Sequence, residues 1–305
     1  MKRMLLFVLA IAAMLFVSAP RTQAELLIAV TDNNTNNVLL RFDSATPGVT
    51  TTVAVTGLVT GDQIIGIDYR PSNGLLYGIA NNFASTTNRL YTINPLTGAA
   101  TFVATLSTPI SSFGIDFNPV PDSQGLPSLR VVTLGGQNLR INADTGATIV
   151  DGNINGVPGN PNITGVAYTN NFFGATSTTL YGIDAASNHL LRFTDPNAGT
   201  VVSVGALGID PTTTLGFDIS GLTGVAYAAL NTQQTGVLSS SLYTINLATG
   251  QATLVGPIGP GGGFLIPGIA ALPGNPVPEP TTLLLLGTGL SGIAAKVRRR
   301  NKNLE

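Results

Sequence analysis

The stretch LYTINLATGQATLV, residues 242–255, decides the fold of this chain because it encodes a strand, a tight turn and a second strand in direct succession. Asn246 opens the turn and Gly250 closes it, and the flanking residues are mostly apolar, β-branched or aromatic. An Asx residue and a glycine between two such runs are typical of a β-hairpin.

The same turn occurs five times along the chain. The glycines that close successive copies lie 50, 48, 53 and 51 residues apart. The copies are Asp43–Gly48, Asn94–Gly98, Asn142–Gly146, Asp195–Gly199 and Asn246–Gly250. This spacing indicates a structural repeat of about 50 residues.

A second motif, a glycine and an apolar residue followed by Asp or Ala, has the same period. Its glycines lie 48, 51, 51 and 52 residues apart. The copies are Gly66-Ile67-Asp68, Gly114-Ile115-Asp116, Gly165-Val166-Ala167, Gly216-Phe217-Asp218 and Gly268-Ile269-Ala270. Two motifs with one period predict an all-β fold, a five-bladed β-propeller in which this motif marks the inner strand of each blade. A β-sandwich and a β-solenoid are the alternatives.

The two ends of the repeat region are expected to share one blade. Residues 26–58 contain only three predicted strands, and residues 266–272 form a lone inner strand with no strand after it. Pairing of these N-terminal and C-terminal strands would complete the blade and close the ring, which would leave no open sheet edge between blades.

Charge and cysteine content exclude several classes of protein. The chain has 305 residues and no cysteine, which excludes disulfides, thiolate metal sites and cysteine nucleophiles. Between residues 25 and 276 there are six arginines and thirteen acidic residues, so this body carries 6 − 13 = −7. We therefore expect no nucleic-acid binding, which needs clustered Lys and Arg.

The N-terminal segment, residues 1–24, is predicted to be a signal peptide. Lys2 and Arg3 precede the apolar run Met4–Val17, and small residues around Ala24 form a site for signal peptidase. An uncleaved anchor helix is the alternative, but it needs a longer apolar span.

The C-terminal segment, residues 277–305, has three parts in a fixed order. Pro278, Glu279 and Pro280 are followed by the uncharged run Thr281–Ala295 and then by a basic cluster containing Arg298, Arg299 and Arg300. The residues themselves indicate a short transmembrane helix held by a cytoplasmic basic cluster. The order closely resembles the PEP-CTERM sorting signal. This resemblance implies that an exosortase recognises Pro278, Glu279 and Pro280 at the inner membrane, and that all six named residues belong to the sorting signal. It also implies export from a Gram-negative bacterium that makes exopolysaccharide.

The predicted domain, residues 25–276, also resembles, over about residues 26–272, a family of secreted bacterial proteins of unknown function. The resemblance is carried by LVTGDQIIGIDYRPSNGLLYGI at residues 58–79, GQNLRINADTGA at 136–147 and NPNITGVAYTNNFFGATSTTLYGID at 160–184. It implies a propeller-like fold and life outside the cytoplasm, but no activity or catalytic residues.

Asp68, Asp116 and Asp218 are the candidate ligands of a channel site. Placed on inner strands, their carboxylates would converge on the axis and could bind Ca²⁺, which prefers oxygen ligands. Alternatively, each Asp accepts hydrogen bonds from the backbone of a neighbouring blade, and the glycines permit close approach. Ala167 and Ala270 interrupt the ring of carboxylates.

Other residues give weaker signals. His189 is the only histidine and is not accompanied by a serine in a nucleophile-elbow context, so it is expected to lie at a strand edge. Asparagine-rich and glycine-rich segments are expected to form loops that could bind a glycan or could serve only as turns. They are Asn33–Asn37, Asn81-Asn82, Asn170-Asn171 and Gly261–Gly263.

These observations predict a non-enzymatic secreted or cell-surface protein that binds or scaffolds extracellular matrix or exopolysaccharide. The alternative is a metal-dependent hydrolase or lyase that acts on extracellular polymers at the channel mouth near Asp68, Asp116 and Asp218. A module with no ligand is the third possibility. We expect no cofactor apart from the candidate Ca²⁺.

Overall fold

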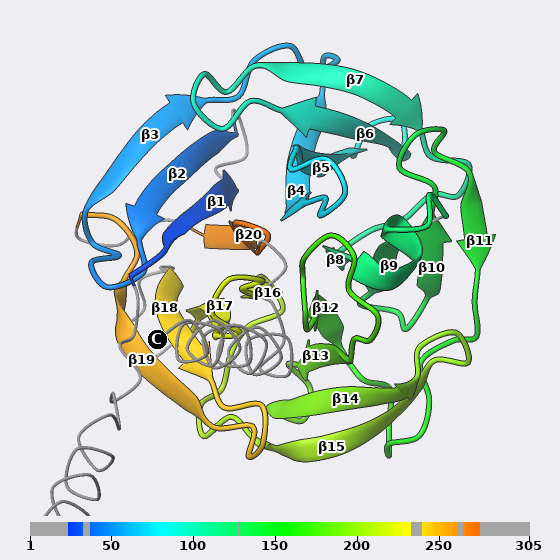
Figure 1. Cartoon of the computed structure of the whole chain (residues 1–305), viewed down its shortest axis with the longest axis vertical. Coiled ribbons are helices and arrows are strands. Elements are labelled where there is room, and N and C mark those ends of the chain that lie inside the picture. Colours follow the sequence, from blue (N-terminus) through cyan, green and yellow to red (C-terminus); the bar gives the residue numbers. More distant parts are fainter. Residues whose placement is uncertain (1–23, 33–36, 127, 233–239, 261–264, 275–305) are drawn as a thin grey trace, which may run out of the picture.

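The strands form five four-stranded antiparallel sheets around a central axis (Figure 1). The computed structural model describes residues 24–32, 37–126, 128–232, 240–260 and 265–274. Each sheet is one blade, so the predicted five-bladed β-propeller is confirmed and the β-sandwich and β-solenoid are excluded. For the first complete repeat, the sequence pattern predicts strands near residues 64–70, 75–80, 89–94 and 100–106, and the structure agrees to within about two residues.

The blades are numbered along the chain, and the strands of each are given from the axis outward. Blade 1 consists of β20 (Leu265–Ala271), β1 (Leu26–Asp32), β2 (Val38–Asp43) and β3 (Thr50–Ala54). Blade 2 consists of β4 (Asp62–Tyr69), β5 (Leu76–Asn82), β6 (Thr87–Ile93) and β7 (Ala100–Thr105). Blade 3 consists of β8 (Phe113–Phe117), β9 (Leu129–Thr133), β10 (Asn138–Ile141) and β11 (Thr148–Val150). Blade 4 consists of β12 (Ile163–Tyr168), β13 (Leu180–Asp184), β14 (His189–Asp195) and β15 (Thr200–Ala206). Blade 5 consists of β16 (Gly216–Ile219), β17 (Ala226–Asn231), β18 (Ser240–Ile245) and β19 (Ala252–Pro257).

The apolar core lies between blades. Five clusters of buried side chains occupy the five interfaces between neighbouring blades; for example, Ile79 and Leu90 of blade 2 pack with Phe117 and Val131 of blade 3. Because a blade buries both faces, its inner strands do not alternate between apolar and polar residues. All seven residues of β5 are buried, whereas the outer strand β19 is largely exposed.

The repeated Asx-Gly turn joins each of the later blades to the preceding one. In blade 2, Asn94 Oδ1 accepts hydrogen bonds from the backbone N–H groups of Leu96 and Thr97, and Gly98 takes a φ of 72°. The backbone of Ala54 in blade 1 lies where a Cβ on Gly98 would be. Glycine is needed here both for the left-handed conformation and for the close approach of the neighbouring blade.

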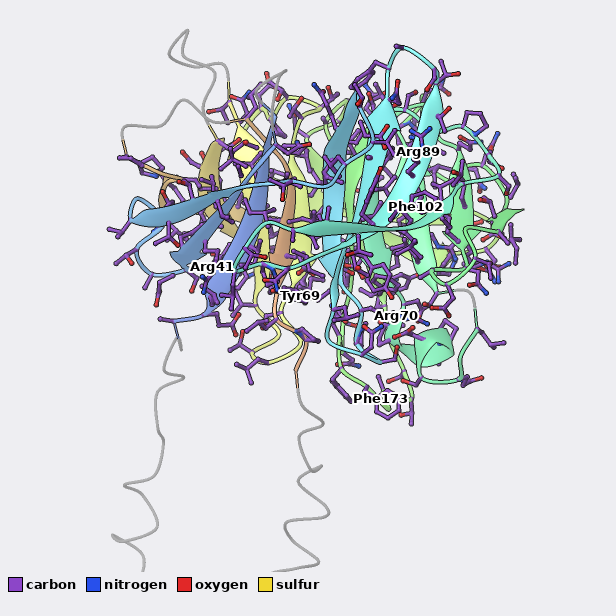
Figure 2. The ribbon with its side chains drawn as sticks, turned by 90° about the horizontal axis from the view of Figure 1, so that it is seen from above. Arg41, Tyr69, Arg70, Arg89, Phe102 and Phe173 are labelled. Atoms are coloured by element: carbon purple, nitrogen blue, oxygen red, sulfur yellow. The ribbon has the colours of Figure 1, made fainter. Side chains whose placement is uncertain are left out.

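The ring closes as the sequence predicts. β1 pairs antiparallel with β20, with Leu27 opposite Ala271 and Ile28 opposite Ala270. Glu25 adds a link to blade 5, because Ser220 Oγ donates to Glu25 Oε1 over 2.9 Å. The start of β1 and the end of β20 therefore lie together on one side of the ring, the side of Arg70 and Phe173 in Figure 2. We call this side the terminal face; it carries the loops that follow the inner strands.

The predicted signal peptide and the sorting-signal residues lie outside the described residues. Pro278, Glu279, Pro280, Arg298, Arg299 and Arg300 are among them. In the part of the chain that the structure describes, no helix is both long enough and apolar enough to span a membrane.

Candidate functional site

The five inner strands approach one another closely at the axis because their motif begins with glycine. A Cβ on Gly114 of β8 would lie 2.7 Å from the carbonyl oxygen of Thr164 in β12. A Cβ on Gly216 of β16 would lie 2.7 Å from the backbone nitrogen of Ile269 in β20. Side chains at these positions would push the blades apart, so the glycines permit the close approach that the sequence suggested.

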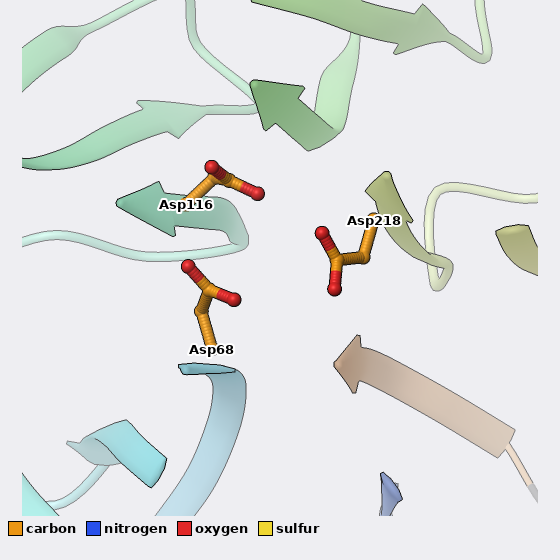
Figure 3. A group of neighbouring side chains, drawn as sticks. All are labelled: Asp68, Asp116 and Asp218. Carbon is orange, nitrogen blue, oxygen red and sulfur yellow. The ribbon is translucent and has the colours of Figure 1, made fainter. Parts of the chain in front are cut away.

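Asp68, Asp116 and Asp218 meet at this axis, as predicted from their place in the motif. Each is 1% exposed, and one carboxylate oxygen from each lies within 4.8 Å of the others. Figure 3 shows the three side chains converging from β4, β8 and β16. We call these residues the axial triad.

Each carboxylate of the axial triad bonds to the backbone of the next blade. Asp68 Oδ2 accepts from Phe117 N at 2.7 Å, Asp116 Oδ1 from Tyr168 N at 3.2 Å, and Asp218 Oδ2 from Ala271 N at 2.6 Å. The last of these bonds holds the closing strand β20. The hydrogen bonds between blades that the alternative interpretation of the motif predicts are therefore present.

The two alanines of the motif explain which N–H groups bond to the second carboxylate oxygens of Asp68 and Asp218. Ala270 and Ala167 precede Asp68 and Asp218 around the ring and offer no carboxylate to the next blade. Asp68 and Asp218 therefore accept from the N–H groups that directly follow them in the chain, those of Tyr69 and Ile219, at 2.7 and 2.6 Å. Asp116 differs because Asp68 already bonds to Phe117 N.

One buried oxygen is left without a partner. The five inner strands present five backbone N–H groups, one from each residue that follows the motif, and the axial triad has six oxygens. Asp116 Oδ2 is the sixth, and no N–H or hydroxyl group of the protein donates to it. Its one possible partner in the protein is a proton shared between carboxyl groups, for which Asp116 and Asp218 are close enough. A buried carboxylate oxygen without a donor is costly, so this position calls for a shared proton, a water or a cation.

Burial raises the pKa of all three carboxyl groups. The pKa values of Asp68 and Asp116 lie well above the usual range, because repulsion within the triad adds to burial. Burial raises the pKa of Asp218 to about 6, against the lowering effect of hydrogen bonds from the backbone of Ala271 and Ile219. In the absence of a cation, burial and mutual repulsion therefore favour the protonated forms of the axial triad over the charged forms.

The axial triad is out of reach of a polymer. The cavity beside it has a volume of about 10 Å³ and is lined by the residues that precede the three aspartates, including Gly66, Gly114 and Gly216. This volume is enough for about one water molecule. A polysaccharide chain cannot reach the carboxylates through so narrow an axis.

A larger depression lies between blades 3 and 4. Two adjoining hollows of about 520 and 290 Å³ share Asn118, Pro121 and Tyr168. We call them together the inter-blade groove. Its other polar lining residues are Thr176, Ser177, Thr178, Thr179, Arg192, Thr194, Ser128, Arg130, Arg140 and Asn197.

The floor of the inter-blade groove is rigid. Arg130 is 1% exposed and donates to Asp151 at 2.6 Å, Asn138 at 2.9 Å and Asn197 at 2.8 Å, and Arg130 Nε lies 3.3 Å from Tyr168 Oη. One wall is the loop that follows β8, which contains the short helix α2 (Pro119–Asp122). Asn118 caps this helix, and proline follows at its first position. The Asn-Pro pair is a local signal for this helix that the sequence analysis missed.

The structure also shows where His189 and two of the asparagines singled out in the sequence lie. His189 is half-buried at the start of β14, opposite Asp184 and Ala206, as expected for a strand residue. Asn81 and Asn82 were expected in a loop, which is wrong: they end β5 and are buried. Asn82 Nδ2 donates to Asp62, so its polarity is used inside the blade. Asn33, Asn34, Asn36 and Gly261–Gly263 lie outside the described residues.

Comparison with known families identifies two parts of the chain. Residues 38–270 match the model of a family described as "Domain of unknown function (DUF4394)". The chain belongs to this family. As a DUF4394 protein it also carries, at residues 276–300, a match to the PEP-CTERM protein-sorting motif. The motif implies export, sorting to the cell surface and processing by an exosortase.

Other comparisons add little about the DUF4394 domain. No curated protein matches the chain. Among solved structures, the chain is similar to one titled "Crystal structure of Nidogen/Laminin Complex", with 12% sequence identity and a TM-score of 0.46. That match covers 82% of this chain and 98% of the other.

Proposed function

We propose that the mature protein is a non-enzymatic propeller that binds exopolysaccharide of the extracellular matrix at the cell surface. The observation that carries this proposal is the inter-blade groove, because its walls carry the hydroxyl groups of Thr176, Ser177, Thr178 and Thr194 beside Arg192. Sugars are bound through many such hydrogen bonds on a preformed surface. The sorting motif supports the proposed location at the cell surface, where an exported protein would meet exopolysaccharide.

The host, which we propose to be a Gram-negative bacterium, would process the chain twice. Signal peptidase would cut after Ala24, and an exosortase would act at the tail after transient anchoring in the inner membrane. The mass of the protein recovered from its native cell tests both steps. A mature mass that still includes residues 281–305 would mean that the tail is a permanent anchor.

Retention of the full chain on immobilised exopolysaccharide tests the proposed binding. We expect the double variant Arg192→Ala/Thr176→Ala to lower the retained fraction at least about tenfold, because both side chains are exposed in the groove. The matched control is Thr52→Ala/Thr101→Ala, two exposed residues of outer strands β3 and β7. It should be retained like the unchanged protein.

Three results would contradict the proposal. Unchanged protein that is not retained would exclude polysaccharide binding, and equal retention of both variants would exclude the groove as its site. New reducing ends in the polymer would favour the alternative function, a hydrolase or lyase.

A further inference from the structure

We infer that the axial triad is a binding site for one divalent cation, with Ca²⁺ the best fit, that locks the propeller ring. This site is separate from the inter-blade groove, so the inference does not depend on polysaccharide binding. It rests on the convergence of Asp68, Asp116 and Asp218, the unpaired Asp116 Oδ2 and the local charge.

The first argument is size. Three oxygens that lie at most 4.8 Å apart have a common centre no more than 4.8/√3, about 2.8 Å, from each of them. Calcium–oxygen distances are about 2.3–2.6 Å and magnesium–oxygen distances about 2.0–2.1 Å. A calcium ion therefore needs only a small inward shift of the carboxylates, whereas Mg²⁺ would require a larger contraction of a tightly packed axis.

The second argument is the set of available ligands. Five of the six carboxylate oxygens accept one backbone hydrogen bond each, and every carboxylate oxygen has two lone pairs. Each of these five therefore keeps one lone pair, and Asp116 Oδ2 keeps both. The cavity of about 10 Å³ at the glycines of the motif has room for about one water molecule. The three converging carboxylate oxygens, the other lone pairs of the same carboxylates and a water would offer all-oxygen ligands of the kind that Ca²⁺ takes.

The third argument is charge. Among the described residues, all ion pairs between arginine and aspartate lie away from the axis, and no arginine or lysine donates a hydrogen bond to the triad. Three buried carboxylates with no positive partner are unfavourable. A divalent ion supplies the missing positive charge, and an exported protein meets Ca²⁺ at concentrations that even weak extracellular sites bind.

A cation in this position would connect blades 2, 3 and 5 directly. It would also fix Asp218, whose Oδ2 holds Ala271 of the closing strand β20. Binding is therefore expected to stabilise ring closure as well as the triad itself.

The test uses the full chain, stripped with EDTA and then supplied with CaCl₂ or MgCl₂ at pH 7.5. We expect one calcium per chain by elemental analysis after dialysis. We also expect Ca²⁺ to raise the Tm by about 5–10 °C when its concentration is a hundredfold above the Kd. Magnesium should raise the Tm less at the same concentration.

Two variants localise the effect. Asp116→Asn should fold, because an asparagine Oδ1 can still accept from Tyr168 N, but it should lose the calcium and the Tm rise. Asp210→Asn, a change at an exposed aspartate, should keep both. If Asp116→Asn does not fold, the calcium content of the unchanged protein and its Tm in EDTA and in CaCl₂ still test the proposed cation site. The inference is overturned by a chain that retains no calcium and has the same Tm in EDTA and CaCl₂, or by a folded Asp116→Asn that binds calcium normally.

Discussion

Buried carboxylates occur both at the axis and away from it, and the two regions neutralise them differently. Away from the axis, inside blade 2, Asp62 accepts from Arg89 and Tyr91 at 2.6 Å each and from Asn82 at 3.0 Å. At the axis, Asp116 has one backbone donor at 3.2 Å and one oxygen with none. The protein donates hydrogen bonds to both carboxylate oxygens of Asp62, whereas no N–H or hydroxyl group of the protein donates to Asp116 Oδ2.

The pKa values of the carboxyl groups also differ between the axis and the region away from it. Burial acts to raise the pKa of Asp151, but hydrogen bonds from Arg140 and Arg130 outweigh it, and the pKa is lowered. At the axis no such donors exist among the described residues, and burial raises the pKa of all three carboxyl groups. The pKa shifts are thus opposite, because Asp151 is only partly buried and bonds to two arginines, whereas the axial carboxyl groups are fully buried without an arginine partner among the described residues.

The largest expected effect on stability comes from removing one of the arginines that neutralise carboxylates away from the axis. Arg130→Met removes a buried guanidinium and leaves Asp151 with Arg140 as its one ion-pair partner among the described residues. It also removes the donor to the side-chain oxygens of Asn138 and Asn197. We expect a loss of about 3–5 kcal/mol in the free energy of unfolding, measured with urea. Arg192→Met, at an exposed arginine, is the control and should change stability by less than about 0.5 kcal/mol. Equal effects of the two variants would contradict the proposed role of Arg130.

The next prediction concerns how the axial triad makes the stability of the fold depend on pH. An acid whose folded pKa is raised contributes stability below its unfolded pKa, and this contribution is lost as pH rises through the folded value. For Asp218, raised from 3.8 to about 6, the loss between pH 4 and pH 8 in EDTA is roughly 3 kcal/mol. Asp151 acts in the opposite sense and loses its contribution as pH falls below about 4.

Urea midpoints of the EDTA-treated protein at pH 4.5 and pH 8 measure this loss. Asp116→Asn should reduce the difference between the two midpoints, because it removes one of the carboxyl groups that repel each other. A midpoint that is higher at pH 8 than at pH 4.5 would mean that the axial carboxyl groups are neutralised by another route.

A smaller effect compares glycines in the same two regions. Gly216→Ala places a methyl group 2.7 Å from the backbone nitrogen of Ile269 and should cost about 1–3 kcal/mol, because the closing strand must move. Gly135→Ala, in an exposed loop with no atom within 4 Å of the added carbon, should be neutral or slightly stabilising. Thermal unfolding of the two variants side by side measures the difference. A neutral Gly216→Ala would show that the axis is less tightly packed than its distances indicate.

The fold could be predicted from the sequence because its signals are local and repeated. The turn at Asn94–Gly98 is built from hydrogen bonds within five residues, and its recurrence gave the number of blades. The closure followed from counting strands in the first and last repeats. The meeting of Asp68, Asp116 and Asp218 also followed, because each occupies the same position on an inner strand.

The rest of the candidate sites could not be predicted because it depends on contacts between distant residues. Arg130 and Asn197 meet across blades 3 and 4, far apart in the chain. Asn197 lies in the repeated turn Asp195–Gly199, but the period of that turn does not indicate a contact with Arg130. The loop with α2 has no counterpart in the other blades, so the period gave no sign of the groove. The unpaired oxygen of Asp116 required knowing that Asp68 already bonds to Phe117 N.

For a chain that crosses the membrane unfolded and N-terminus first, the pairing of β1 with β20 determines when the domain can complete its fold. A chain that crosses the membrane from its N-terminus delivers β1, β2 and β3 first, and these strands must wait for residues 265–271 before blade 1 has its inner strand. Until then β4 and β16 also lack a neighbour at the axis. The ring can close only when almost the whole domain has been translocated, when the sorting motif at residues 276–300 is next to cross. Completion of the fold and arrival of the sorting motif at the membrane are therefore nearly simultaneous.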